Sequence, residues 1–283
     1  MRERLSKIKL IVSDMDGTLL DHKNQIPDRT VKAIAALENS GRAKFAIGTG
    51  RSRHAASNLF PDSFGFFDRP GIFLNGTQTH GPGGAVIHTR VIGGFALQTI
   101  LDSLEDFFPE ILSIIICTGD ECIAYPDVSA FSFYLSARFS DPHPQPSQEP
   151  LHLIGEKANM ISILVKHPEK DFKWVAELLA ELTAKLNLQL TRSLGNLICV
   201  MPSATSKASG VIALADSLGL ELSEVAVIGD ANNDLEMFHC AGLAVAVGNA
   251  IPELKAVAHW IVNENDHPEL PGVAQLIETI LTA

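Results

Sequence analysis

The sequence has few cysteines, no excess of basic residues and no long apolar run, and each absence narrows the class of protein. Its 283 residues contain four cysteines, too few for the disulfide framework of a small secreted domain. None forms a Cys-x-x-Cys pair, so we expect buried, reduced thiols. The formal net charge of -11 lacks the basic footprint that nucleic acids and anionic membranes attract. We therefore expect neither as a partner.

The apolar runs are short, which bears on the location of the protein. The segment MRERLSKIKLIV is charged, and the short apolar run at its end stops before Asp14, unlike the apolar stretch of a signal peptide. No later run approaches the roughly 18 residues of a membrane-spanning helix. We therefore expect a cytoplasmic protein. A composition of 46% hydrophobic and 19% charged residues is that of a globular chain with a buried core.

Apolar strands and amphipathic helices alternate at both ends of the chain. The strands expected at 8–12, 44–47 and 71–74 are joined by helical segments, and the same alternation returns after residue 203. This pattern predicts a parallel, doubly wound sheet. In between, strands that pair with their neighbours, helices and the proline-rich segment 141–150 indicate a separate module.

These patterns predict an α/β fold with an insertion. The core is a doubly wound, Rossmann-like parallel sheet formed by residues 1–89 and 203–283, and residues 90–202 form an inserted α+β cap domain.

Polar residues cluster where predicted strands end. In an open α/β sheet, ligands bind beyond the carboxyl ends of the strands, so we expect these residues to share one site. They are Asp14 and Asp16 after the first strand, Thr49 and Gly50 after the second, Lys207 at a helix start, and Asp230, Asn233 and Asp234 after a later strand.

Carboxylates that converge in this way require a cation. Two unit charges ~4 Å apart repel by about 4 kcal/mol at an effective dielectric constant of 20. Oxygen ligands without a nearby histidine or cysteine cluster favour Mg²⁺. We assign Asp14 and Asp230 as carboxylate ligands and the backbone carbonyl of Asp16 as a third. Asp234 and Asn233 support them from one helical turn further on.

The other groups suit a phosphoryl group. The Thr49 hydroxyl, the Gly50 amide and the Lys207 ammonium can bind its oxygens. Asp14 can then attack the phosphorus and form an aspartyl-phosphate. Asp16 can protonate the leaving group and later activate water. The close pair of aspartates thus supplies one nucleophile and one acid/base.

The motifs resemble those of the haloacid dehalogenase-like (HAD) superfamily. DMDGTLLD at 14–21 is similar to its DxDGTL motif, GTGR at 48–51 to its second motif, and Lys207 with its helix to the third. GDANNDLEMF at 229–238 is similar to the fourth motif, GDxxND. LNG at 74–76 and AVGNA at 246–250 are typical of the Cof-type branch.

This resemblance covers the whole chain and implies a fold and an activity. The insertion is similar to the class II, type B cap, and the family implies a phosphatase. It gives Asp14 the role of nucleophile and Asp16 that of acid/base, with Thr49 and Lys207 on the phosphate and Asp230 on the metal. The segment near Asn265 and Gly272 departs from the family pattern, so its contacts stay open.

The sequence therefore predicts a Mg²⁺-dependent phosphomonoesterase for a small soluble organophosphate, such as a sugar phosphate or a phosphorylated cofactor precursor. Three alternatives stay open: a phosphomutase, a phosphotransferase on the same core, and a non-enzymatic phosphometabolite-binding protein. Arg51 is either a substrate-binding cation or a structural residue at a helix start. Asn75 is either a turn residue or a contact to the substrate.

Overall fold

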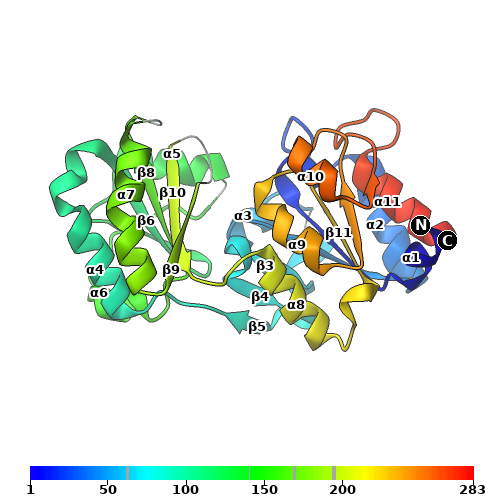
Figure 1. Ribbon diagram of the computed structural model, residues 1–283, viewed down its shortest axis with the longest axis horizontal. Helices are drawn as coiled ribbons and strands as arrows, with labels where there is room; N and C mark the ends of the chain where they lie inside the picture. Colours follow the sequence, from blue (N-terminus) through cyan, green and yellow to red (C-terminus); the bar gives the residue numbers. More distant parts are fainter. Residues whose placement is uncertain (62–63, 140, 168–169, 193–195) are drawn as a thin grey trace. The chain divides into compact units, whose positions relative to one another are not determined.

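A computed structural model describes residues 1–61, 64–139, 141–167, 170–192 and 196–283 (Figure 1). The chain divides into two compact units. The first contains Met1–Gly50, Leu59–His88 and Ser206–Ala283, and the second contains Arg51–Asn58 and Thr89–Thr205. The four cysteines are free thiols, and three of them are buried. No helix in the described ranges is long and apolar enough to cross a membrane.

An eight-stranded sheet, in the order β13-β12-β11-β1-β2-β3-β4-β5, forms the centre of the first unit. The strands β1, β2, β3, β11, β12 and β13 pair in parallel, and β4 pairs with β3 in the antiparallel direction. The inner strands β1 and β11 are buried along their whole length, as expected for a parallel sheet covered on both faces. The bounds are β1 Leu10–Ser13, β2 Lys44–Gly48, β3 Gly71–Phe73, β4 Gln78–His80, β5 Val86–Thr89, β11 Val225–Gly229, β12 Leu243–Ala246 and β13 Trp260–Ile261.

Helices lie on both sides of this sheet. Figure 1 shows α8, α9 and α10 on one side and α1, α2 and α11 on the other, which is the doubly wound arrangement that the sequence predicted. The bounds are α1 Arg2–Lys7, α2 Asp28–Ser40, α8 Lys207–Ser217, α9 Leu235–Cys240, α10 Pro252–Val257 and α11 Gly272–Thr282.

The second unit is built on a five-stranded sheet, in the order β7-β6-β8-β10-β9, whose neighbours are all antiparallel. One face carries alternate apolar residues such as Ile116, Ile161 and Ile198, which form a core with Leu97 and Val175 from two helices. The strands are β6 Ile111–Thr118, β7 Glu121–Tyr125, β8 Met160–Val165, β9 Leu188–Arg192 and β10 Leu197–Pro202. The helices are α3 Arg53–Ser57, α4 Gly94–Leu104, α5 Ala130–Phe139, α6 Leu151–Gly155 and α7 Lys170–Lys185.

The division differs from the predicted bounds by a few residues at Thr89 and at 203–205, and by a whole segment at 51–58. Residues 51–58 were assigned to the core, but they group with the second unit. Hydrogen bonds explain this: the Ser52 hydroxyl donates to Asp141, and the His54 backbone N–H donates to Asp120 at 3.0 Å. Both acceptors lie far along the chain, so no local pattern could have revealed them.

Candidate active site

The turn after β1 separates the two neighbouring aspartates. The Asp14 backbone N–H donates to the Ile228 carbonyl of β11 at 2.9 Å, and the chain then turns over Met15–Leu19, where Asp16 and Gly17 have non-helical backbone angles. Asp14 is buried and Asp16 is exposed. Gly17 has a φ of 83° and lies against Asp230, since a Cβ built on it would be 2.9 Å from the carboxyl carbon. Only glycine suits both demands.

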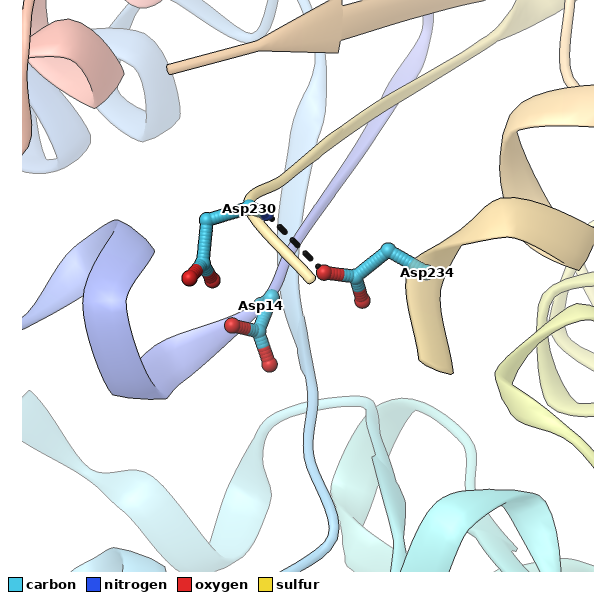
Figure 2. A group of neighbouring side chains, drawn as sticks. All are labelled: Asp14, Asp230 and Asp234. Atoms are coloured by element: carbon cyan, nitrogen blue, oxygen red, sulfur yellow. Dashed lines mark hydrogen bonds between the residues drawn. The ribbon is translucent and has the colours of Figure 1, made fainter. Parts of the chain in front are cut away.

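Three carboxylates gather where β1 and β11 end (Figure 2). Each of Asp14, Asp230 and Asp234 offers an oxygen within 4.8 Å of the others. Asp230 Oδ1 accepts a hydrogen bond from the Thr18 hydroxyl at 2.9 Å. Asp234 Oδ2 accepts from the backbone N–H groups of Asp230 at 3.0 Å and Ala231 at 3.1 Å. Asp234 therefore fixes the turn that carries Asp230.

Lys207 joins two of these carboxylates. It is the first residue of α8, a helix that begins with a capping box formed by Ser206 and Ser209. Its side chain is fully buried, and Nζ donates to Asp14 Oδ1 at 2.5 Å and to Asp234 Oδ1 at 2.7 Å. Burial alone would lower the pKa of this ammonium, but the two carboxylates raise it above its ordinary value. Lys207 is therefore a permanent cation.

Asp14 and Asp230 lie in surroundings that oppose the ionisation of their carboxyl groups. Burial raises the pKa of Asp14 well above its ordinary value; Lys207 opposes this, and the charges of Asp234 and Asp230 add to it. Burial likewise raises the pKa of Asp230, and Asp234 adds to the effect. A further positive charge at this point would favour the ionised carboxylates and so lower the pKa values of Asp14 and Asp230.

The carboxylate oxygens of this cluster are suitable ligands for a hard divalent cation. Lys207 occupies one oxygen of Asp14, and Thr18 occupies one oxygen of Asp230, so each carboxylate keeps a second oxygen for an ion. Both oxygens of Asp234 already accept hydrogen bonds. This arrangement favours Asp14 and Asp230 over Asp234 as direct ligands, and oxygen ligands suit a metal of the Mg²⁺ class.

The remaining predicted residues of the first unit lie next to one another. Thr49 is buried, its N–H donates to the Ile72 carbonyl, and its carbonyl accepts from the Asn75 N–H at 3.0 Å. A Cβ on Gly50 would be 3.1 Å from the Asn75 amide. Asn233 is exposed and donates to Asn75 Oδ1 at 3.4 Å. The sequence left the role of Asn75 open between a turn residue and a contact to the substrate. In the structure this residue links the segments that follow β2 and β11.

Arg51 is not among the residues that the first unit gathers. It belongs to the second unit, where it is buried. Burial raises the pKa of Asp141, while the Ser52 hydrogen bond and the charge of Arg51 lower it. The charge of Arg51 thus acts on Asp141 within the second unit, and both of its predicted interpretations, a substrate-binding cation or a structural residue at a helix start, stay predictions.

The family model for haloacid dehalogenase-like hydrolase matches residues 11–277. The chain therefore belongs to the haloacid dehalogenase-like hydrolase family, as its motifs predicted.

Individual relatives extend over nearly all of this chain. An *Arabidopsis thaliana* protein named Endoribonuclease YBEY, chloroplastic, is 29% identical over 96% of this chain, which spans only 46% of that protein. A *Bacillus subtilis* protein named 5-amino-6-(5-phospho-D-ribitylamino)uracil phosphatase YwtE is 28% identical over 97% of this chain and 99% of its own length. A solved haloacid dehalogenase-like hydrolase from *Bacteroides thetaiotaomicron* superposes with a TM-score of 0.80 at 24% identity, over 96% of this chain and 99% of that one. These findings confirm the predicted fold class and an enzyme of the phosphatase class.

Proposed function

We propose that this chain is a Mg²⁺-dependent phosphomonoesterase that acts through an aspartyl-phosphate on a small organophosphate. The observation that carries the proposal is the environment of Asp14. Its carboxylate contacts the buried Lys207 at 2.5 Å and shares a cluster with Asp230, while the exposed Asp16 follows two residues later. A nucleophile, a fixed cation and an acid/base are the groups that phosphoryl transfer needs.

The proposed reaction has two steps. Asp14 attacks the phosphorus, the bond to the ester oxygen breaks, and Asp16 gives its proton to that oxygen. Water then loses a proton to Asp16 and attacks the phosphorus, which frees Asp14 and releases phosphate. Lys207 holds Asp14 in place for both steps. Thr49, Gly50 and Asn233 bind phosphoryl oxygens. Asp14 and Asp230 would hold Mg²⁺, which would supply positive charge against those oxygens.

The class of substrate is proposed from charge and from the relatives. A chain with a net charge of -11 lacks the excess of basic residues that binds nucleic acid. This favours a small metabolite as the substrate. The Bacillus relative is named for a phosphorylated ribitylaminouracil, so we propose a sugar phosphate or a phosphorylated cofactor precursor. A cytoplasmic location stays a prediction.

A metal-dependent assay tests this function. We expect the wild type to release phosphate from p-nitrophenyl phosphate with Mg²⁺ and to lose activity with EDTA. Asp14→Asn should lower kcat by roughly 10³-fold or more, whereas Asp216→Asn, at an exposed position of α8, should not. No turnover by the wild type on this ester or on a panel of phosphorylated metabolites would overturn the proposal. Transfer of phosphate to a second metabolite without free phosphate would indicate a mutase or transferase.

A further inference from the structure

Two asparagines from the last part of the chain hold the loop that carries Asp16. Asn249 Nδ2 donates to the Gly17 carbonyl at 2.7 Å, and Asn265 Nδ2 donates to the Leu20 carbonyl at 2.6 Å. The two asparagines are also joined, because the Asn265 backbone N–H donates to Asn249 Oδ1 at 3.0 Å. That bond orients the Asn249 amide so that its NH₂ group faces Gly17.

The two segments that supply these amides are in direct backbone contact. The Gly248 N–H donates to the Asn263 carbonyl at 3.0 Å, and the Gly272 N–H donates to the Glu264 carbonyl at 3.0 Å. A Cβ on Gly248 would be 2.8 Å from the Glu264 backbone nitrogen, so a larger residue would push the segments apart. The asparagines are thus placed by backbone hydrogen bonds and close packing.

The amides act on the loop that carries Asp16, between its attachments at Asp14 and Thr18 and its end at Leu20. Asp14 is tied to β11 through its N–H, and Thr18 is tied to Asp230. Asp16 is exposed, and it is followed by Gly17, whose left-handed conformation sets the direction of the chain. Fixing the Gly17 carbonyl therefore fixes the peptide plane between Gly17 and Thr18, which follows Asp16 by one residue and limits how the loop that carries Asp16 can move.

We propose that Asn249 and Asn265 are positioning residues that hold Asp16 where it can protonate the leaving group. The inference rests on the proposed function, because that function makes Asp16 the proton donor. It predicts that weakening this support harms reactions that need the proton more than reactions that do not.

The leaving group of the substrate provides the test. An alkyl phosphate must have its leaving oxygen protonated, whereas p-nitrophenolate leaves without a proton. General acid catalysis is worth about 10²–10⁴-fold, so we expect Asn249→Ala to lower kcat on an alkyl phosphate at least ~10-fold. On p-nitrophenyl phosphate the loss should be only a few-fold, with little change in KM for either ester.

Asn263 provides a matched control. Its Nδ2 donates to the Leu270 carbonyl at 2.9 Å, and its N–H donates to Gln275 Oε1 at 2.7 Å, so it ties the same segment without touching the Asp16 loop. Asn263→Ala should affect both esters equally. Should Asn249→Ala fail to fold, Asn265→Ala removes only the bond to Leu20 and allows the same comparison.

Asp16→Asn separates the role of Asp16 as proton donor from the positioning role of Asn249 and Asn265. If Asp16→Asn loses no more activity on the alkyl ester than on p-nitrophenyl phosphate, the assigned role of Asp16 is wrong. If it shows the selective loss while Asn249→Ala and Asn265→Ala behave like Asn263→Ala, the positioning role is overturned and the proposed function stands.

Discussion

At the scale of single residues, Lys207 is the group on which the cluster depends most. Its ammonium is fully buried and lies between two carboxylates that are almost fully buried themselves. Buried charges are tolerated only when they are paired. Removing one member therefore leaves the others without compensation.

Lys207→Met should lower the free energy of unfolding by about 3–5 kcal/mol, measured by urea denaturation in EDTA. A carboxyl whose folded pKa lies above its unfolded value takes up protons first in the folded state. Without Lys207 the folded pKa of Asp14 should rise further, since the ammonium lowers it in the wild type. The loss should therefore be largest at high pH, where Asp14 is charged in both proteins, and shrink as pH falls and Asp14 takes up a proton. Lys185→Met, which breaks an exposed pair with Glu181, is the control and should cost nothing measurable. Equal losses in the two variants would contradict this account.

At the scale of elements, α8 and the turn after β1 bring distant residues to one sheet edge. The helix can approach β3 and β4 closely because Gly210 has no side chain. A Cβ there would be 3.0 Å from Ile72 Cγ1 and 3.1 Å from Thr79 Oγ1. The position of Lys207 thus depends on a glycine one turn further along the helix.

Gly210→Ala tests this packing. In an open helix, alanine would stabilise by about 1 kcal/mol, but overpacking here should give a net loss of about 1–3 kcal/mol. Thermal denaturation measures the effect. Asp216→Ala, exposed near the end of α8, should be neutral or stabilising, because it removes a negative charge from the helix C-terminus. A stabilising effect of Gly210→Ala would show that the helix can shift.

Elements with a clear local pattern could be predicted from the sequence. Alternating apolar strands and helices predicted the parallel core, and the strand ends indicated the residues that meet there. The helix α5 was missed, because residues such as Phe131, Phe133 and Tyr134 are exposed and give no clear period. The helix α11 was missed because it begins at Gly272 after Pro271, without a capping side chain.

Contacts that join distant backbone groups could not be predicted. The amides of Asn249 and Asn265 bind main-chain carbonyls, and a carbonyl has no signature in the sequence. The sequence also did not reveal that 51–58 group with the second unit. The reason is similar, since the partners of this segment, Asp120 and Asp141, lie in another part of the chain. The catalytic and metal-binding roles remain predictions that the geometry supports.

At the scale of the whole molecule, the proposed metal site would couple metal binding to folding. A cation that binds only the folded chain raises Tm, so Mg²⁺ should raise Tm of the wild type more than NaCl of equal ionic strength does. Asp230→Asn should remove most of this difference. Because burial raises the pKa values of Asp14 and Asp230, protons should displace Mg²⁺ at a higher pH than for ordinary carboxylates. An undiminished Mg²⁺ effect in Asp230→Asn would place the ion elsewhere.

The central claim is that Asp14 becomes phosphorylated during turnover. Rapid acid quenching during turnover with Mg²⁺, followed by sodium borohydride, reduces an acyl phosphate to an alcohol, and peptide mass spectrometry locates the reduced residue. The account predicts reduction at Asp14 in the wild type, and none without substrate or in Asp14→Asn. Reduction at Asp16 instead, or steady turnover with Asp14 never modified, would contradict it.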